Sequence, residues 1–370
     1  MTSEIIKTGI EDLGYSDFFE SNRARLRLDK FLVARVIVEY RGAYKVKNLN
    51  GEYLAKVTGK RIFKALSRED YPAVGDWVVI EELPEQQAVI KEILPRKTVI
   101  KRIHKDRSRV GGKNETQIIA TNIDVAFVIE SVDRDFNLNR FERYFAIAKD
   151  GGIRPAIILN KIDLISKEEL NVKLAQIKNR FNDVDFIPTS VIADEGLENL
   201  KNYIKKDKTY CFLGSSGVGK SSLINKLLGE NVIKTENISI STGKGKHTTT
   251  SREMYFLENG AVVVDNPGMR EVGMADTGLG IDSLFEEISI LAKKCKYVDC
   301  THIHEPGCQV LSSLESGKLD KGKYYNYINL KSEVDHYEMD ELEKREKDRN
   351  FGKFIKKAKK ELKKHGVRGY

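Results

Sequence analysis

The chain is 370 residues long, 40% hydrophobic and 32% charged, and it carries a formal net charge of +8. This length exceeds one ordinary hydrophobic core and predicts two or three domains. The first thirty residues lack the apolar h-region of a signal peptide, and no apolar run approaches the roughly 20 residues of a membrane helix, so we expect a cytoplasmic protein.

The positive charge is concentrated in two segments. Arg96–Lys113 and Phe351–Tyr370 each contain eight basic residues and one acidic residue. Two such blocks on a nearly neutral body indicate a polyanionic partner, either RNA or DNA. For one block alone, a flexible linker or a solvated helix face is the simpler interpretation.

The sequence changes character near residue 31. Residues 1–30 are polar and are expected to form an N-terminal extension that is either poorly ordered or a short helix. Residues 31–95 contain five short runs of alternating apolar and polar residues, a pattern typical of strands. Five strands in this length predict a small closed β-barrel, an OB-fold, although an SH3-like barrel fits the pattern nearly as well. The runs are FLVARVIVEY, AYKVKNL, EYLAKVT, DWVVIEEL and AVIKEIL.

After a basic linker at residues 96–121, strands and helices alternate. Short, nearly continuous apolar runs are typical of buried parallel strands. Residues 122–280 are therefore predicted to form a doubly wound α/β domain. Residues 281–370 are predicted to form a mostly helical domain that ends in a lysine-rich helix. The predicted strands are VAFVIE, AIILN, DFIPTS, YCFLG and AVVVD, with helices at residues 139–149, 167–181 and 220–228.

The sequence GSSGVGKS, which begins at Gly214, matches the G-x-x-x-x-G-K-S phosphate-binding loop, or P-loop. A predicted strand precedes it and a predicted helix follows, which is the context that the motif requires. Its backbone N–H groups and the helix N-terminus would surround the phosphates. Lys220 would reach the β- and γ-phosphates, and Ser221 would ligate Mg²⁺. The residues predicted to bind nucleotide here are Gly214, Ser215, Ser216, Gly217, Val218, Gly219, Lys220, Ser221 and Ser222.

Two later segments fit the γ-phosphate side of such a site. The apolar strand AVVVD ends in the D-x-x-G motif Asp265–Gly268. We expect Asp265 to hold the Mg²⁺ shell through water and the Gly268 N–H to contact the γ-phosphate. In STGKGKHTTTSRE, one threonine is expected to complete the Mg²⁺ coordination. Thr249 and Thr250 are favoured over Thr248.

A guanine-recognition motif, NKID, occupies residues 160–163. The Asp163 carboxylate would accept hydrogen bonds from the N1–H and 2-amino groups of guanine. Adenine lacks both donors and would leave the carboxylate desolvated and unpaired. Asn160 and Lys161 are expected to support the base and brace the P-loop. This motif argues against the alternative of an ATP-driven enzyme with a zinc module.

The base-recognition segments precede the P-loop, whereas a conventional small GTPase begins with its P-loop. TSVIADEG resembles the fifth GTPase element and would place Ser190 and Val191 beside the base. The same sheet can be built in either order, because the termini of folded domains often lie close together. In the permuted order both switch segments lie directly before the C-terminal region, which the γ-phosphate could then move.

A cysteine–histidine cluster lies near the C-terminal end. In a cytoplasmic chain, clustered cysteines favour a metal site over disulfides. Three thiolates and one imidazole form a complete tetrahedral zinc set with no open position, so the site would be structural. His304 is a competing ligand, and Cys211 is expected to be an ordinary core residue. The predicted zinc ligands are Cys295, Cys300, His302 and Cys308.

Taken together, these segments resemble the RsgA (YjeQ) family of circularly permuted GTPases over almost the whole chain. The chain departs from the family in DNPG, where DTPG is usual, and in GKGKH, where the family is arginine-rich. The resemblance implies an OB-fold, a central GTPase domain and a C-terminal zinc domain. The matching segments are VGDWV, ATNIDVAFVI, LNKIDL, GSSGVGKSSLIN, GKGKHTTTSRE, DNPGMRE and the cysteine–histidine spacing.

The resemblance also implies a function. It predicts a GTP hydrolase that is slow alone, is stimulated by the small ribosomal subunit, and acts in the late maturation of that subunit. The expected partners are the small subunit with its rRNA and GTP or GDP, with Mg²⁺ and one structural Zn²⁺ as cofactors. No membrane partner is expected, and nothing requires a dimer, so a monomer is expected.

The residue after D-x-x-G is Met269, which cannot orient a water molecule by hydrogen bonding. The chain alone is therefore expected to be a poor catalyst. The resemblance supports His247 as the catalytic residue, with a solvated loop histidine as the alternative interpretation. The alternative function is a nucleotide-gated, RNA-binding regulatory protein in which hydrolysis is incidental.

Overall fold

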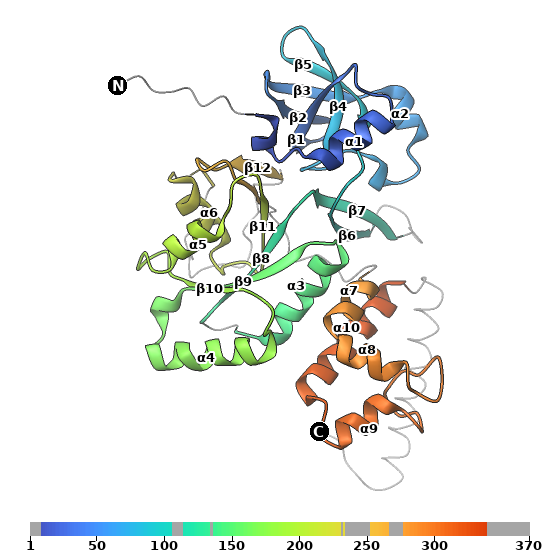
Figure 1. Cartoon of the computed structure of the whole chain (residues 1–370), viewed down its shortest axis with the longest axis vertical. Coiled ribbons are helices and arrows are strands. Elements are labelled where there is room, and N and C mark those ends of the chain that lie inside the picture. The colour runs from blue at the N-terminus through green and yellow to red at the C-terminus, as the bar shows by residue number, and fades with distance from the viewer. Residues whose placement is uncertain are drawn as a thin grey trace, which may run out of the picture.

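The computed structural model describes residues 9–105, 114–133, 136–230, 232–233, 252–265 and 277–338. Figure 1 shows three parts along the longest axis, with a barrel at one end, an α/β part in the middle and a helical part beside its far end. Within the described ranges, no helix is both long and apolar enough to cross a lipid bilayer.

The N-terminal extension contains the 3-10 helix η1 (Ile10–Leu13) and the short helix α1 (Asp17–Arg25). A short helix was one of the two forms expected for this extension. Tyr15 and Phe19 are buried against Trp77 of the barrel, and the rings of Tyr15 and Trp77 meet edge to face at 4.7 Å. The aromatic side chains of the extension therefore belong to the core at the base of the barrel.

The five predicted barrel strands are confirmed. Strand β1 pairs antiparallel with both β2 and β4, β2 pairs with β3, β3 pairs in parallel with β5, and β5 pairs with β4. This ring is closed and is that of an OB-fold, which removes the SH3-like alternative. Helix α2 (Gly59–Lys64) and the 3-10 helix η2 (Arg68–Asp70) connect β3 to β4. The strands are β1 (Leu32–Tyr40), β2 (Ala43–Asn48), β3 (Gly51–Val57), β4 (Trp77–Leu83) and β5 (Gln87–Ile93).

The segment for which only a basic linker was predicted forms a two-stranded antiparallel sheet, β6 (Val99–Lys105) and β7 (Asn114–Thr121). Ile100 and Ile119 on this hairpin are buried in the central core. The segment contains β-branched residues that favour strands, but its many basic residues led to the interpretation as a linker. Lys101, Arg102 and Lys105 of the first basic block therefore lie on strand β6.

The central sheet has five parallel strands in the order β10-β9-β8-β11-β13, and β12 (Glu253–Phe256) pairs antiparallel with β13 at the edge. Its strand β8 is buried along its whole length, which explains the continuous apolar run in its sequence. Sequence analysis predicted all of these strands except β12. The parallel strands are β8 (Val125–Ser131), β9 (Arg154–Asn160), β10 (Phe186–Thr189), β11 (Thr209–Leu213) and β13 (Val262–Asp265).

Helices cover both faces of this sheet, as a doubly wound fold requires. Helices α3 (Leu138–Asp150) and α4 (Lys167–Arg180) contribute Phe141 and Ile177 to the core on one face. Helices α5 (Leu197–Tyr203) and α6 (Lys220–Leu228) contribute Leu197 and Leu223 to the core on the other face. Figure 1 shows the two pairs of helices on opposite sides of the strands.

The barrel and the central sheet are hydrogen-bonded to each other. Val38 of β1 pairs antiparallel with Glu253 of β12, which joins the strands into one 11-stranded sheet. An ion pair of 2.8 Å between Arg252 and Glu39 lies beside this pairing. The strand that lies between the two predicted switch segments is therefore attached to the barrel.

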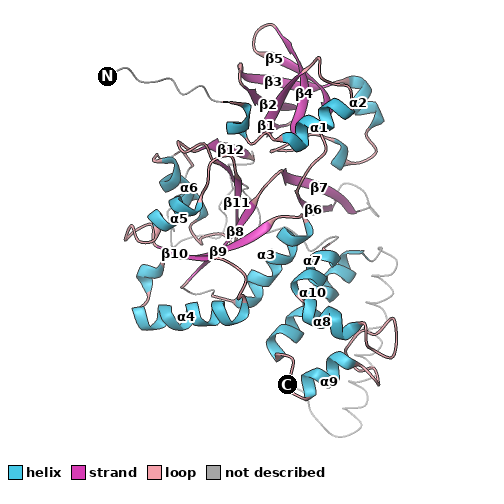
Figure 2. Ribbon diagram, in the orientation of Figure 1, coloured by secondary structure: helices cyan, strands magenta, loops and turns pink. Residues whose placement is uncertain are grey.

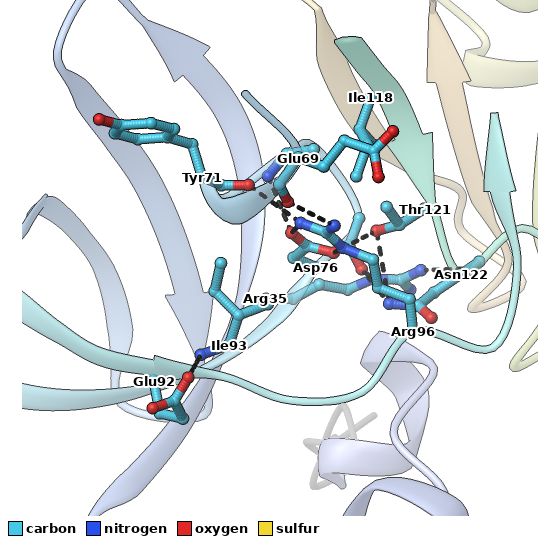
Figure 3. Close-up of polar contacts among 12 residues, drawn as sticks. Arg35, Glu69, Tyr71, Asp76, Glu92, Ile93, Arg96, Ile118, Thr121 and Asn122 are labelled. Carbon is cyan, nitrogen blue, oxygen red and sulfur yellow. Dashed lines mark hydrogen bonds and ion pairs between the residues drawn. The ribbon is translucent and has the colours of Figure 1, made fainter. Parts of the chain in front are cut away.

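A buried polar cluster reinforces this junction (Figure 3). The Asp76 carboxylate accepts hydrogen bonds from Nε and Nη2 of Arg96, at 2.8 and 2.7 Å, and from the Thr121 hydroxyl at 2.7 Å. Arg35 of β1, which is only 1% exposed, donates to the Asn122 carbonyl oxygen at 3.1 Å and to Thr209 Oγ1 at 2.9 Å. Because Thr209 begins β11, this arginine joins the barrel to the strand that leads into the P-loop.

The C-terminal part is helical, as Figure 2 shows by colour and as the sequence predicted. Its helix α7 packs on α3 so closely that a Cβ atom on Gly280 would lie 2.1 Å from the Ala146 carbonyl oxygen. Arg143 of α3 forms a two-pronged ion pair with Glu333, with one contact at 2.7 Å. The predicted lysine-rich C-terminal helix lies outside the described residues. The helices are α7 (Gly278–Leu284), α8 (Glu286–Ala292), α9 (Gln309–Glu315) and α10 (Lys321–Glu338).

Candidate nucleotide site and metal centre

The predicted nucleotide-binding segments meet at one edge of the central sheet. The P-loop follows β11, residues 160–163 follow β9, and Ser190 follows β10, while Asp265 is the last residue of β13. All four strands are parallel, so their carboxyl ends lie at the same edge, where doubly wound sheets bind ligands. The permuted order of the segments therefore does not separate them in space.

The P-loop adopts a backbone that only glycine supports at its two ends. Gly214 and Gly219 have φ angles of 154° and 99°. A Cβ atom on Gly214 would lie 2.4 Å from the Ile129 carbonyl oxygen of β8. The Lys220 ammonium group donates to the carbonyl oxygens of Gly214 and Ser215 at 2.7 and 2.6 Å, so it spans the mouth of the loop. The motif predicts that this ammonium group contacts phosphate oxygens.

Asn160 connects the guanine-recognition motif to the P-loop. Its side chain is buried, its Nδ2 donates to the Val218 carbonyl oxygen at 2.8 Å, and its Oδ1 accepts from the Thr189 hydroxyl at 3.0 Å. A Cβ atom on Gly219 would lie 2.2 Å from Asn160 Nδ2. The glycine of the P-loop therefore leaves the space that this asparagine occupies.

Asp163 is held by the segment after β10. Its Oδ1 accepts a hydrogen bond of 2.5 Å from the Ser190 hydroxyl, and Ser190 Oγ in turn accepts from the Ala193 N–H at 2.9 Å. The backbone of Ser190 pairs in both directions with Glu195, which closes a tight loop. Val191 follows Ser190 and packs against the core on the α5–α6 face of the sheet. The Asp163 carboxylate is thus held by the loop after β10, which was predicted to lie beside the base.

Sequence analysis missed Asp133, which lies just after β8. Its Oδ2 is 3.0 Å from the Lys161 ammonium nitrogen, and its Oδ1 accepts from the Ser131 hydroxyl. Lys161 has a left-handed backbone with φ of 63°, a conformation that is strained for a residue with a side chain. No sequence motif marks Asp133, and its place after the strand between β9 and β11 is defined only by the folded sheet.

Helix α3 also contacts the P-loop. Burial raises the pKa of the Tyr144 phenol, while a hydrogen bond with Ser215 of the P-loop partly offsets this rise. The preceding residue, Arg143, makes the ion pair with Glu333 of α10. Adjacent residues of one helix therefore contact the phosphate loop and the C-terminal helical part.

The switch residues are only partly described. Asp265 ends β13 opposite Glu253 of β12, at the same edge of the sheet as the P-loop. The other predicted residues of the γ-phosphate side lie outside the described residues. They are His247, Thr248, Thr249, Thr250, Gly268 and Met269.

The predicted zinc ligands form a compact group. Cys295, Cys300, His302 and Cys308 place their ligand atoms within 4.8 Å of one another. Cys295 Sγ lies 3.8 Å from Cys308 Sγ, and His302 Nδ1 lies 3.6 and 3.4 Å from these two sulfur atoms. With Zn–S of about 2.3 Å and Zn–N of about 2.0 Å, a tetrahedral zinc ion requires ligand separations of about 3.5–3.8 Å. The four residues are therefore compatible with a zinc site.

The competing candidate ligand His304 and the remaining cysteine, Cys211, are separate from this group. His304 is exposed and is not a member of the cluster. Cys211 is buried in β11, and burial raises the pKa of its thiol far above the ordinary value, as expected for a core residue.

Backbone N–H groups surround the thiols. The Gln309 N–H donates to Cys295 Sγ and the Leu311 N–H donates to Cys308 Sγ, both at 3.4 Å. Burial opposes ionisation of Cys295, but N–H donors, including that of Gln309, outweigh it and lower the pKa of the thiol. The Tyr324 hydroxyl donates to the His302 carbonyl oxygen at 2.8 Å and ties α10 to the cluster. The contact from Gln309 favours the thiolate of Cys295, which is the form that binds metal, whereas burial raises the pKa of the Cys300 thiol.

The chain matches the family model described as RsgA GTPase over residues 93–275. It is 38% identical over 328 residues to "Small ribosomal subunit biogenesis GTPase RsgA 1" of Bacteroides thetaiotaomicron, which covers 88% of this chain and 90% of the relative. It is 39% identical over 356 residues to "Small ribosomal subunit biogenesis GTPase RsgA 2" of Lactiplantibacillus plantarum, covering 95% of this chain and 96% of the relative.

Two solved structures share the fold. The crystal structure of YjeQ from Thermotoga maritima aligns with a TM-score of 0.57 at 23% identity, over 80% of this chain and 96% of that one. The structure of YloQ, described as a circularly permuted GTPase, aligns with a TM-score of 0.56 at 22% identity, over 84% of this chain and 96% of that one.

Proposed function

This chain belongs to the RsgA GTPase family and is a GTP hydrolase. From this premise, we propose that it acts in the late maturation of the small ribosomal subunit. The names of its relatives support this role. The observation that carries the nucleotide assignment is the hydrogen bond between Asn160 and the Val218 carbonyl oxygen, which unites the base-recognition and phosphate-binding segments.

Guanine selection would depend on Asp163. Ser190 holds one carboxylate oxygen at 2.5 Å, which fixes the orientation in which the carboxylate can accept two parallel hydrogen bonds from a guanine edge. An adenine in the same place would leave this carboxylate without donors. Lys161, turned by its left-handed backbone and held by Asp133, would cover the base.

The phosphates would be bound by the P-loop N–H groups, the N-terminus of α6 and Lys220. Mg²⁺, which the family requires for GTP hydrolysis, would supply neutralisation of the phosphate charge. Ser221 and one of Thr249 and Thr250 would be its direct ligands, and Asp265 would act through water. Gly268 would contact the γ-phosphate.

Hydrolysis needs an oriented water molecule, and Met269 cannot provide this by hydrogen bonding. We infer that His247 does so and that the small subunit stimulates hydrolysis by ordering the segment that contains this histidine. The four-residue cluster would hold one structural zinc ion, which leaves no open coordination position for catalysis. Its role would be to fix the helices that pack on α3.

The remaining assignments follow the same premise. We propose three functional domains, at residues 31–95, 122–280 and 281–370, preceded by an extension at residues 1–30. The segment at residues 96–121 joins the first two. The partners would be the small subunit with its rRNA, bound by a monomer in the cytoplasm.

The decisive experiment measures GTP hydrolysis with and without purified small ribosomal subunits, for the native chain and for His247→Ala. We expect strong stimulation of the native chain and little stimulation of the variant, with GTP affinity preserved in both. If the subunits bind but do not stimulate hydrolysis, the second candidate function applies, in which nucleotide only gates RNA binding. The net positive charge favours that candidate's RNA partner as well.

A further inference from the structure

We propose that the connection between β3 and β4 is a docking surface for single-stranded RNA, with Phe63 as the residue on which a base stacks. This surface, here called the α2 segment, comprises residues 59–68. The proposal rests on the proposed role at the small subunit, because it names the kind of RNA that the barrel would contact there.

The α2 segment exposes large apolar side chains to solvent. Phe63 is 91% exposed, Leu66 is 98% exposed and Ile62 is 50% exposed. Soluble proteins rarely present several adjacent apolar side chains without a partner, and such patches mark interaction sites. The flanking barrel strands expose less, with Leu54 of β3 at 48% and Leu83 of β4 at 42%, so the exposure is greatest at Phe63 and Leu66.

The sequence of the α2 segment is basic. Its own sequence contains Lys60, Arg61, Lys64 and Arg68 and no acidic residue. It continues into η2, where the Glu69 carboxylate lies 3.7 Å from the Lys101 ammonium nitrogen of β6. The Arg96 guanidinium also donates to the Glu69 and Tyr71 carbonyl oxygens at 2.9 Å, as Figure 3 shows. The apolar segment thus continues into residues that contact Arg96 and Lys101 of the first basic block.

This combination favours unpaired RNA over other partners. An aromatic ring among cations binds single strands because bases stack on the ring while the cations contact phosphates. Duplex RNA offers no unstacked base to such a ring. A membrane surface needs a longer amphipathic helix than α2, which has six residues. A protein partner of standard size needs a much broader contact than three side chains provide.

The first test uses Phe63→Trp as a fluorescent reporter in the full chain. Trp77, the single tryptophan of the chain, is fully buried among Tyr15, Phe19 and Arg35, so its emission provides a constant background. We expect an oligouridylate of about twelve nucleotides to quench the introduced indole, and an RNA duplex of equal length to leave it unchanged. Val172→Trp on α4, where the native side chain is 58% exposed, is the matched control that should not respond.

The second test compares Phe63→Ala with Val172→Ala in binding to purified small subunits and to the oligouridylate. Phe63→Ala removes the ring on which one base stacks, so it should weaken the binding of both ligands by about tenfold. Val172→Ala should leave both affinities unchanged. The salt dependence of binding should keep its slope, because that slope counts phosphate contacts and the phenylalanine makes none.

Each result separates the possibilities. Equal affinities for Phe63→Ala and the native chain would overturn the inference and leave the role at the small subunit intact. Weaker subunit binding without quenching by the oligouridylate would also overturn it, because the partner would then be a protein. If the native chain bound no small subunits at all, the proposed function itself would fail.

Discussion

Asn160 at the end of β9 donates a hydrogen bond of 2.8 Å to the carbonyl oxygen of Val218, 58 residues later in the chain. The same side chain accepts from the Thr189 hydroxyl at 3.0 Å. One buried amide therefore joins the loops after β9, β10 and β11. A change at this residue should affect the base and phosphate halves of the site together.

We expect Asn160→Ala to weaken GTP and GDP binding by about 10- to 100-fold, because two buried groups lose their partner and each costs about 1–3 kcal/mol. Titration with a fluorescent guanine nucleotide measures this directly. Asn50→Ala provides the control, because Asn50 is an exposed asparagine on the distant barrel. An affinity equal to that of the control would show that the loops hold their positions without the bond.

Asp133 is expected to act on nucleotide through Lys161, whose ammonium nitrogen lies 3.0 Å from its carboxylate. Asp133→Asn should weaken guanine nucleotide binding by about three- to tenfold, as expected for a partly buried ion pair. The substitution should have no further effect once Lys161→Ala is present, because Asp133 acts only through Lys161. If the losses in nucleotide affinity were additive in this double-mutant cycle, the two residues would act independently.

The sequence predicted much of this site because its motifs specify backbone chemistry. The glycines of the P-loop and the carboxylate of NKID are needed at fixed places after strands, so strand prediction also located the loops. Asp133 was missed because a lone aspartate after a strand carries no motif. Its role depends on the parallel order β9-β8-β11, which only the folded sheet defines.

Cys308→Ser is expected to abolish most zinc binding and to lower the thermal midpoint of the C-terminal helices, because one of four ligands is removed. The zinc released per chain on thiol modification should be about one for the native chain and near zero for the variant. Cys211→Ala changes a buried thiol outside the cluster and should retain the metal. Equal zinc content in the two variants would contradict the assignment.

Arg35→Met should destabilise the junction between the barrel and the central sheet. Burial lowers the pKa of this guanidinium to about 10, so it is still charged at neutral pH, and it donates to the Asn122 carbonyl oxygen and to Thr209. The variant leaves these buried acceptors without a donor, a loss of about 2–4 kcal/mol. The midpoint of thermal unfolding should fall by about 5–10 °C.

The control for this change is Arg154→Met, which removes an arginine from an exposed ion pair with Asp185. Exposed pairs contribute less than about 1 kcal/mol, so this midpoint should move by no more than ~3 °C. If Arg35→Met were as mild as this control, the polar junction would not hold the two parts together.

The junction between the barrel and the central sheet was not predictable from the sequence. The barrel was predicted from its alternating strands, but Arg35 lies within β1 as one polar residue among apolar neighbours, and nothing in the pattern shows that it is buried. The hairpin β6–β7 was predicted only as a linker because its charges dominate its composition. Arg35 and the hairpin are buried by residues that are far away in the chain. The local periodicity of the sequence therefore cannot predict their burial.

Strand β12 borders β1 on one side and β13 on the other, and its ion pair with the barrel joins residues 213 positions apart. A shortened chain that began after the barrel would leave this strand with one unpaired edge, where foreign strands can add. It would also leave Thr121, Asn122 and Thr209 without the donors and acceptors that now surround them. We therefore expect the α/β part, once separated from the barrel, to self-associate through this edge.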